Sequence, residues 1–436
     1  MTNINWSKGT SLACQGVLLT LGDYYGTLAA ARYFGKLGIP VYLAEWRRFV
    51  PSALSKYVTK VIRCPNVSDW QAFSDWLLDF GQRQPGLFLY PTSDDTAWIY
   101  ASRKKNLSQY YYMLQPGSET IYSLLNKVKL HELCEKAGLK APKTHLVHSE
   151  FDLQKVAEGL EYPVLIKPRT QIGSITRAKG HICQTKAELL EAYPKFMKKN
   201  SYVPEIKAID PFIEWPMIQS FHKDAMGNTL SIAGVTLESG EIFLVRGSKK
   251  VIQRPRKLGI GLCFQGCDIP PEIAEACRLF CKEAKYFGAF ELEMIYVEET
   301  ETYLLIDFNP RYYSQMAFEI ARDLPIPGLV YMAAAGKSAE LNQLVTTAKA
   351  WKSHSKDIYS IKWLFYLFLS TALMGRNISW KEYTGWLKWL YEDQTHYVDA
   401  VMDRSDRRPF FGDVLTQMFH YVRHPFSTYR RFFRDN

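Results

Sequence analysis

Residues 290–311 constrain the fold of this 436-residue chain more than any other segment, because they predict two strands joined by a polar turn. Side chains alternate between the two faces of a strand, so Glu291 and Glu293 share one face of the first strand. By the same alternation, Asp307 and Asn309 share one face at the end of the second strand.

The acids on these strands need an explanation, because Asp and Glu are depleted in strands and are rarely buried unless they are paired or bind a metal. Carboxylate and amide oxygens are ligands that suit Mg²⁺ held between a protein and phosphate groups. A surface hairpin with solvated acids is the alternative, and the pattern by itself leaves both interpretations open.

Basic residues upstream of this hairpin stand at positions that favour ligand contact. Lys127 opens a helix predicted over 126–137, and Lys167 ends an apolar strand predicted over 161–168. A lysine at a strand end can reach into a cleft, and lysine is seldom buried without a partner. A hairpin predicted at 230–248 carries further basic residues along and after its second strand, namely Arg246, Lys249, Lys250, Arg254 and Arg256. A solvated basic face is the alternative for that group.

The beginning of the chain predicts an α/β domain. Residues 16–45 read as strand, glycine turn, helix and strand, which is a βαβ opening. The turn lacks the third glycine of a dinucleotide fingerprint, so it indicates NAD binding only weakly. The strand predicted at 87–90 runs into the polar segment 91–95, and ligands bind at such carboxyl ends of strands in open α/β sheets. A capped helix beginning at 93 or 94 is the alternative for that segment.

The composition changes after about residue 340. Residues 363–374 are apolar all round, but the run is too short to cross a bilayer, which needs about 20 residues. Residues 410–433 mix aromatic side chains with arginines, a pattern typical of helices that dock on anionic lipid. A helical cap packed on the rest of the protein is the other interpretation.

Bulk properties narrow the class of protein. The net charge is +10, but we expect no nucleic-acid partner because no nucleic-acid motif is present. The chain shows no signal-peptide pattern, and its eight cysteines are spread as in a reducing cytosol, so we expect a cytoplasmic protein. Cys277 and Cys281 lie four residues apart on a helix predicted at 270–286, which indicates a shared buried face rather than a metal site.

In this order, the segments resemble the ATP-grasp enzymes, most closely the carboxylate–amine ligases and the large chain of carbamoyl-phosphate synthetase. The resemblance covers roughly residues 10–340, and its second hairpin strand ends in Asp307, Phe308, Asn309, Pro310 and Arg311, with Asp where Glu is more usual. It implies an α/β ATP-grasp fold with a Rossmann-like domain over 1–120, an ATP-grasp domain over 121–340 with a lid at about 145–220, and a C-terminal helical extension over 341–436.

The resemblance also assigns site residues. The flap over the phosphates corresponds to 170–174, which holds fewer glycines than is usual in these enzymes. The acidic residue expected to hold the ribose, Asp224, comes slightly earlier in the sequence than usual. The residues implied are Glu293, Asp307 and Asn309 for Mg²⁺ or Mn²⁺; Lys127, Lys167, Gly173 and Ser174 for the ATP phosphates; Gln219, Ser220, Phe221 and Asp224 for adenosine; and Arg254, Arg256 and Arg311 for the transferring phosphoryl group or an anionic substrate.

The activity implied is that of an ATP-dependent ligase. ATP phosphorylates a small-molecule carboxylate to give an acyl phosphate and ADP, and an amine then displaces phosphate to form an amide-type bond. Two other functions stay open: a membrane-associated ligase on the inner face of the membrane, acting on a lipid-linked or cell-envelope substrate, and a non-catalytic nucleotide-binding protein. Whether the protein is a homodimer is open as well.

Overall fold

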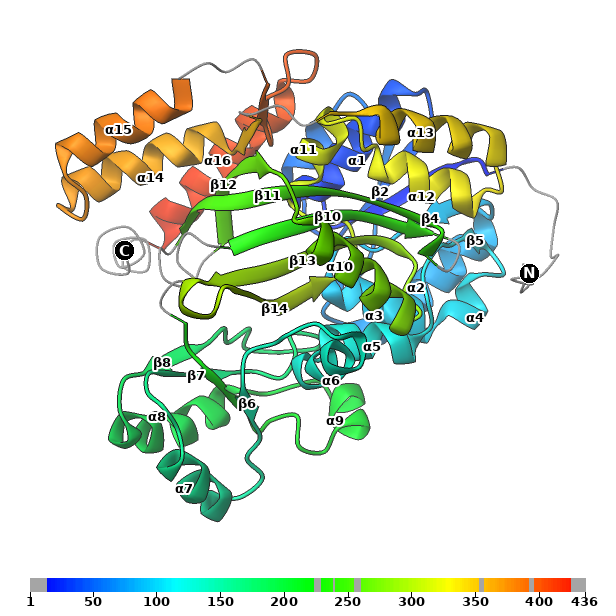
Figure 1. The fold of residues 1–436 in the computed structure, drawn as a ribbon. Coiled ribbons are helices and arrows are strands. Elements are labelled where there is room, and N and C mark those ends of the chain that lie inside the picture. Colours follow the sequence, from blue (N-terminus) through cyan, green and yellow to red (C-terminus); the bar gives the residue numbers. More distant parts are fainter. Residues whose placement is uncertain are drawn as a thin grey trace.

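The computed structural model describes residues 14–222, 229–237, 240–254, 260–352, 357–391 and 396–424. These residues form three sheets, and Figure 1 shows the smallest of them projecting with its helices from a larger body. The chain is therefore a mixed α/β protein, as the alternating strand and helix patterns predict.

The first sheet is parallel and has the strand order β3-β2-β1-β4-β5. Its strand β1 is buried along its whole length, as expected for a short apolar strand of a parallel sheet that is covered on both faces. The βαβ opening predicted over 16–45 is confirmed. The elements are β1 (Gly16–Thr20), α1 (Tyr25–Lys36), β2 (Val41–Glu45), the 3-10 helix η1 (Pro51–Leu54), β3 (Lys60–Arg63), α2 (Trp70–Arg83), β4 (Leu87–Leu89), α3 (Asp94–Ser102), α4 (Lys104–Leu107) and β5 (Tyr111–Tyr112).

The small sheet is antiparallel in the order β6-β9-β7-β8, and helices α7 and α8 pack on it (Figure 1). The small sheet and its helices have a hydrophobic core of their own, separate from the clusters in the rest of the protein. The segment contains α5 (Ser118–Leu125), α6 (Lys127–Ala137), β6 (Thr144–His145), α7 (Glu150–Glu158), β7 (Val164–Lys167), β8 (His181–Cys183), α8 (Lys186–Lys199), α9 (Pro204–Ile209) and β9 (Met217–Ser220).

The central sheet has seven strands in the order β14-β13-β10-β11-β12-β15-β16. Both predicted hairpins are confirmed in it, since β10 pairs with β11 and β13 pairs with β14, each antiparallel. The strands and the helices that follow are β10 (Thr229–Leu237), β11 (Ile242–Arg254), β12 (Ile260–Cys267), α10 (Pro271–Glu283), β13 (Gly288–Val297), β14 (Thr302–Asn309), α11 (Met316–Ala321), α12 (Ile326–Ala334) and α13 (Ser338–Ala350).

The first and central sheets share their hydrophobic cores. One cluster joins Leu18 of β1 to Leu292 of β13, and another joins Val17 of β1 to Val235 of β10 and Leu329 of α12. These contacts link segments more than 200 residues apart in sequence and hold the first sheet against the central one.

The C-terminal segment is more than the helical extension expected from its composition, because it also supplies two strands of the central sheet. β15 pairs with β12, and β16 pairs with β15. The apolar run at 363–374 is confirmed as a helix with a buried side, which lies in a third core cluster. The elements are β15 (Ile358–Ser360), α14 (Lys362–Met374), α15 (Trp380–Tyr391), β16 (Tyr397–Asp399) and α16 (Arg408–Arg423).

A buried ion pair fastens this C-terminal segment to helix α1, which packs on the first sheet. Arg32 of α1 donates from Nε to Asp406 Oδ2 at 3.0 Å and from Nη2 to the carbonyl of Val401 at 2.7 Å. Asp406 also accepts from Ser55 Oγ at 2.6 Å and from the Lys56 amide at 3.1 Å. We call Arg32, Ser55, Lys56, Val401 and Asp406 the Arg32–Asp406 junction. Each polar group named here has its partner within the junction.

The cysteines and the longest helices bear on two further expectations. All eight cysteines are free, and Cys277 and Cys281 lie buried on one side of α10, as expected from their spacing. In the part of the chain that the structure describes, no helix is both long and apolar enough to span a bilayer.

Candidate active site between the small sheet and the central sheet

The site is built around the rung of the β13–β14 ladder where Glu293 lies directly opposite Asp307. Each carboxylate is paired with a lysine from another element. Lys250 of β11 contacts both oxygens of Glu293, at 2.9 and 3.0 Å, and Lys127 of α6 contacts Asp307 Oδ1 at 2.6 Å. We call these four residues, together with Lys167, the lysine–carboxylate cluster.

Lys127 is placed by the start of helix α6. The Asn126 side chain caps this helix by accepting from the amides of Val128 and Lys129, and the Lys127 amide donates to the Arg169 carbonyl at 2.7 Å. The Lys127 residue is only 7% exposed, so its ammonium group is held beside Asp307 with little competition from water. The start of α6 and the end of β7 thus place Lys127 and Lys167 near enough to Asp307 to lower its pKa, while their expected contact with phosphate oxygens stays a prediction.

The pKa of Lys167, at the end of β7, depends on burial and on the charged groups around it. Burial and the neighbouring Lys127 lower the pKa of Lys167, Asp307 and Glu293 act in the opposite direction, and the net result is a pKa of about 8. Burial alone would raise the pKa of Asp307, but Lys127 and Lys167 outweigh it and hold that pKa below its ordinary value. The cluster therefore has more positive than negative groups, which suits an additional anion.

Lys250 belongs to the group of basic residues that the sequence could not assign to either a ligand site or a solvated face. Burial lowers the pKa of this lysine, but Glu293 more than compensates and raises it above the ordinary value. Its neighbour Lys249 is exposed, and Arg246 is buried with its guanidinium bonded to the carbonyls of Arg322 and Ala348. The basic group predicted along β11 therefore divides into one cluster member, one solvated lysine and one structural arginine.

Arg254 and Arg256 were the other basic residues expected here. Arg254 ends β11 and pairs in register with Ile260, but the side chains of 253, 254 and 260 are outside what the structure describes. Arg256 lies outside the described residues altogether. Their roles stay predictions.

Arg311 follows β14 and ties the hairpin to the first sheet. Its Nε donates to Asp94 Oδ1 at 2.5 Å, its Nη2 to Asn309 Oδ1 at 2.7 Å, and its Nη1 to the Tyr312 carbonyl at 3.2 Å. Asp94 opens helix α3, at the polar segment that ends strand β4, so this segment reaches the site and also starts a capped helix. The capped helix expected at 93 or 94 is therefore confirmed, and a ligand contact by 91–95 stays a prediction.

Glu291 lies two residues before Glu293 on the same face of β13, opposite Asn309, and differs from Glu293 in that its hydrogen bonds come from uncharged side chains. Its Oε2 accepts from Asn309 Nδ2 at 3.1 Å, and its Oε1 accepts from Ser231 Oγ at 2.7 Å and from Gln315 Nε2. Burial and, after it, the nearby Glu293 raise the pKa of Glu291 to about 7. The sequence predicted its face correctly but not its partners.

The donor set fits a divalent cation shared with phosphate oxygens. Glu293 and Asp307 offer two opposed carboxylates, the Asp307 side chain is 41% exposed, and Asn309 offers an amide oxygen two residues after Asp307 on the same strand face. Among the described residues, no group of three or more His, Cys, Asp or Glu side chains is arranged to hold a metal. Two carboxylates and an amide are, however, enough for Mg²⁺ when a bound phosphate completes its shell.

The loop 170–174, expected to be a flap over the phosphates, packs inward. The Gly173 amide donates to Asp95 Oδ1 at 2.9 Å, Arg177 pairs with the other oxygen of Asp95, and Ser174 is buried. Gly173 has a φ of +61°, and a Cβ there would approach Val203 Cγ2 to 2.6 Å. Glycine is therefore required by conformation and by space, and a role of this loop in phosphate binding stays a prediction.

The segment expected to be the adenine hinge is strand β9 and the residues after it. The Gln219 side chain donates to Thr144 Oγ1 at 3.3 Å, and the Ser220 amide donates to the Lys143 carbonyl at 2.9 Å. That amide is therefore engaged within the protein, and Phe221 follows directly. Asp224 lies outside the described residues. Adenosine binding by these residues is untested.

His131, one turn after Lys127 on α6, is a buried residue that sequence reasoning did not single out. Its Nδ1 lies 3.1 Å from Thr144 Oγ1, and its Nε2 has no hydrogen-bond partner among the described residues. Burial and, after it, the charges of Lys127 and Lys167 lower the pKa of His131 to about 4, so the ring is neutral near pH 7. Its i, i+4 spacing from Lys127 was a signal in the sequence.

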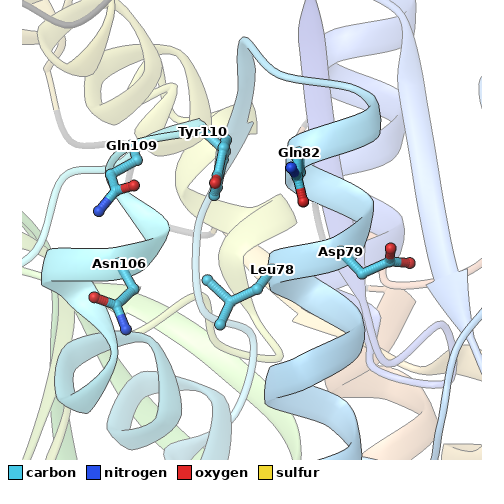
Figure 2. A pocket seen from close by; sticks show the side chains of 6 residues that line it. All are labelled: Leu78, Asp79, Gln82, Asn106, Gln109 and Tyr110. Carbon is cyan, nitrogen blue, oxygen red and sulfur yellow. The ribbon is translucent and has the colours of Figure 1, made fainter.

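A separate surface hollow of about 360 Å³ lies between α2 and the residues around α4, as Figure 2 shows. It is lined by Leu78, Asp79, Gln82, Asn106, Gln109 and Tyr110. None of these residues belongs to the lysine–carboxylate cluster, and Asp79 is already paired with Arg83 on the same helix. The hollow supplies no group to the chemistry described above.

Comparison with solved structures identifies the fold. An L-amino acid ligase from Bacillus licheniformis superimposes with a TM-score of 0.58 at 16% identity, covering 76% of this chain and 77% of that one. The biotin carboxylase domain of Hydrogenobacter thermophilus 2-oxoglutarate carboxylase, solved with MgADP, ADP and bicarbonate, gives 0.57 at 14% identity and covers 79% and 71%. The N5-carboxyaminoimidazole synthetase of Staphylococcus aureus gives 0.53 at 16% identity and covers 74% and 78%. The chain has the ATP-grasp fold.

Comparison with curated sequences points to the same class. The chain is 21% identical over 241 residues to a D-aspartate ligase of Enterococcus faecium, covering 53% of this chain and 55% of that protein. It is 26% identical over 219 residues to the carbamoyl phosphate synthase large chain of Thermotoga petrophila, covering 48% and 18%. The chain thus spans about half of the first relative and a fifth of the second. No protein-family profile matches it.

Proposed function

We propose that this protein is an ATP-dependent ligase that forms a carbon–nitrogen bond. A carboxylate oxygen of the acid substrate attacks the γ-phosphorus of ATP, giving an acyl phosphate and ADP. The nitrogen of an amine then attacks the acyl carbon, the C–O bond to phosphate breaks, and inorganic phosphate and the amine's proton leave. The observation that supports this most directly is the lysine–carboxylate cluster, which lies where an ATP-grasp fold brings the small and central sheets together.

The roles of the charged residues follow from their pairing. Glu293, Asp307 and Asn309 would hold Mg²⁺ or Mn²⁺, with Mn²⁺ resting on the donor chemistry alone. The cation, when bound, neutralises charge on the phosphate oxygens. Lys127 and Lys167 are placed to exchange a carboxylate partner for a phosphate oxygen, and the long lysine side chain permits this exchange. Arg311, held by Asp94, would orient an anionic substrate.

The remaining assignments belong to the same proposal. Backbone groups near Phe221 would contact adenine, Gly173 and Ser174 would lie over the phosphates, and Arg254 or Arg256 would approach the transferring phosphoryl group. The division into domains at 1–120, 121–340 and 341–436, with 145–220 as a lid, is part of it too. We place the protein in the cytoplasm, and sedimentation equilibrium would decide between monomer and homodimer.

The experiment that tests the activity is Mg²⁺-dependent release of ADP from ATP with pooled carboxylates and amines, in the presence of hydroxylamine. Hydroxylamine converts an acyl phosphate to a hydroxamate, so one pool that yields both ADP and hydroxamate would support the proposal and reveal the acid. Saturable ATP binding without turnover in any pool would instead favour a nucleotide-binding protein or an unsampled substrate. Release of AMP would contradict the acyl-phosphate chemistry.

A specific surface feature favours a second property, peripheral contact with a membrane. Helix α16 packs one side against η1, where Gly412 lies beside Leu54, and leaves an apolar stripe exposed on the other side. The stripe consists of Phe411, Leu415, Met418, Phe419 and Val422, which are 53–80% exposed. Their spacing of three and four residues places them on one face of the helix, and Arg423 at its end suits anionic lipid.

Sedimentation with vesicles rich in phosphatidylserine tests this contact. We expect the wild type to sediment and the triple variant Met418→Ser, Phe419→Ser, Val422→Ser to stay in solution. Phe151→Ser is the matched control, because Phe151 is 77% exposed on α7, away from α16. Equal sedimentation of all three proteins, or of none, would refute the membrane contact without affecting the ligase proposal.

A further inference from the structure

Glu291 occupies an unusual position for a carboxylate, because it is only 4% exposed and lies directly opposite Asn309 on the β13–β14 ladder. Its hydrogen-bond partners are uncharged side chains rather than the lysines of the cluster. Three donors surround it: Asn309 Nδ2 on one oxygen, and Ser231 Oγ with Gln315 Nε2 on the other. A buried carboxylate with this many fixed partners is held in place and can itself hold others.

The partner that matters for the site is Asn309. The oxygen and nitrogen of an asparagine amide have almost the same shape, so only hydrogen bonding decides which of them points where. A carboxylate accepts and cannot donate, which draws Nδ2 toward Glu291 at 3.1 Å. A guanidinium donates and cannot accept, which draws Oδ1 toward Arg311 Nη2 at 2.7 Å. The two neighbours therefore specify one orientation of the amide.

This orientation has a consequence for the cation site. An amide oxygen has two lone pairs, and the bond from Arg311 uses one of them, which leaves the other available. The opposite orientation would turn an NH₂ group, which cannot bind a cation, toward the site. Groups behind the ligands of a metal commonly act in this way, by fixing the orientation of the ligating atom.

We propose that Glu291 is a positioning residue that fixes the Asn309 amide with its oxygen toward Arg311 and the cation. The inference rests on the proposed function, since it presupposes that a nucleotide-linked cation binds at this rung. Glu291 contributes no ligand of its own; it acts through Asn309, and Ser231 and Gln315 hold it from behind.

Glu291→Gln tests this with almost no change of shape. The oxygen of the introduced amide would face Ser231 and Gln315, so its NH₂ group would face Asn309 Nδ2, donor against donor. If Asn309 turned over to relieve that clash, its own NH₂ group would face Arg311, again donor against donor. In neither arrangement are all the groups satisfied, so the Asn309 amide loses its single orientation.

The readout is ADP binding by calorimetry, with and without Mg²⁺. In the wild type we expect Mg²⁺ to tighten ADP binding. In Glu291→Gln we expect the Mg²⁺-dependent gain to fall by about 10–100-fold, the usual cost of losing a group that orients a metal ligand. ADP affinity without Mg²⁺ should stay within about twofold, because Lys127 and Lys167 are untouched. A role limited to stability would lower both affinities together.

A reciprocal swap removes the remaining ambiguity. In Glu291→Gln/Asn309→Asp the donor and acceptor of this hydrogen bond are exchanged, and the introduced carboxylate at position 309 offers an oxygen toward Arg311 in either orientation. We expect the swap to recover the Mg²⁺-dependent gain, whereas Asn309→Asp alone sets two carboxylates against each other and should not. Lys129→Ala is a control, because the exposed Lys129 side chain takes no part in the cluster, and this variant should keep the gain.

Three results would overturn the inference: an unchanged Mg²⁺-dependent gain in Glu291→Gln, a loss in that variant of Mg²⁺-free binding to the same extent, or failure of the reciprocal swap to recover the gain in a folded protein. Failure of the proposed function is distinguishable from these, because the wild type itself would then not bind ADP or would show no effect of Mg²⁺.

Discussion

The Arg32–Asp406 junction and the lysine–carboxylate cluster are both built from ion pairs, but only at the junction is every charge paired and shielded from water. At the Arg32–Asp406 junction both side chains are sealed from water, 9% and 1% exposed, and their partners are groups fixed in the fold. In the lysine–carboxylate cluster Asp307 is 41% exposed, and three lysines share two carboxylates. A group of charges that are all paired within the protein holds two segments together, whereas a partly exposed group with an excess of positive charge can bind an anionic ligand.

The largest effect on stability should come from breaking the junction. Asp406→Ala leaves the buried Arg32 guanidinium without its carboxylate, and removing one member of a buried pair costs about 3–5 kcal/mol. Urea unfolding followed by circular dichroism measures the change. A loss below about 1 kcal/mol, the range of exposed pairs, would show that the junction does not fasten the C-terminal segment.

Lys127→Ala should act on ligand binding rather than on folding. A charge-assisted hydrogen bond contributes roughly 1.5–3 kcal/mol, so we expect ATP to bind about 10–100-fold more weakly. Lys129→Ala is the matched control, because Lys129 lies two residues further along the same helix and takes no part in the cluster. Equal ATP affinity in the two variants would remove Lys127 from the binding site.

Lys167 gives the cluster a dependence on pH, because burial and then Lys127 lower its pKa to about 8. The folded protein loses this proton as pH rises through about 8, whereas the unfolded chain keeps it until about pH 10.5. Metal-free ADP affinity should therefore fall between about pH 7 and 9, while the contribution of Lys167 to stability becomes more favourable from about pH 8 to 10.5. In Lys167→Arg, which stays charged, the fall in affinity should disappear; if it persists unchanged, Lys167 is not its source.

The smallest effect is expected at the surface hollow of Figure 2. Asp79 and Arg83 are an exposed i, i+4 pair, 62% and 64% exposed, so Asp79→Ala should cost about 0.3–0.5 kcal/mol and leave ATP binding unchanged. Calorimetry and urea unfolding measure both quantities. A change in ATP affinity of about tenfold or more would mean that the hollow communicates with the site.

The sequence allowed prediction of those features that depend on local patterns. Strand alternation placed Glu291 and Glu293 on one face of the first strand and Asp307 and Asn309 on one face of the second. Lys127 was placed at a helix start and Lys167 at a strand end, because these signals lie within a few residues of each side chain. The pairing of Lys250 with Glu293 could not be predicted, since it depends on the order and register of β11, β10 and β13 in the sheet.

Long-range contacts set the same limit elsewhere. Arg311 and Asp94 are 217 positions apart, so nothing local connects them. Strands β15 and β16 are each three residues long, and β15 joins the central sheet by pairing with β12. Strands this short leave little local pattern in a segment that is otherwise aromatic and helical, so the sequence did not reveal them. The partners of Glu291 likewise come from three separate elements.

The most direct test of the central claim, that the open cluster serves catalysis rather than folding, is ADP release by Asp307→Asn measured beside its urea unfolding curve. The account predicts at least about a 100-fold loss of turnover, as when one group that stabilises charge in a transition state is removed, with an unfolding midpoint close to that of the wild type. Turnover within a few-fold of the wild type, in a folded variant, would contradict it.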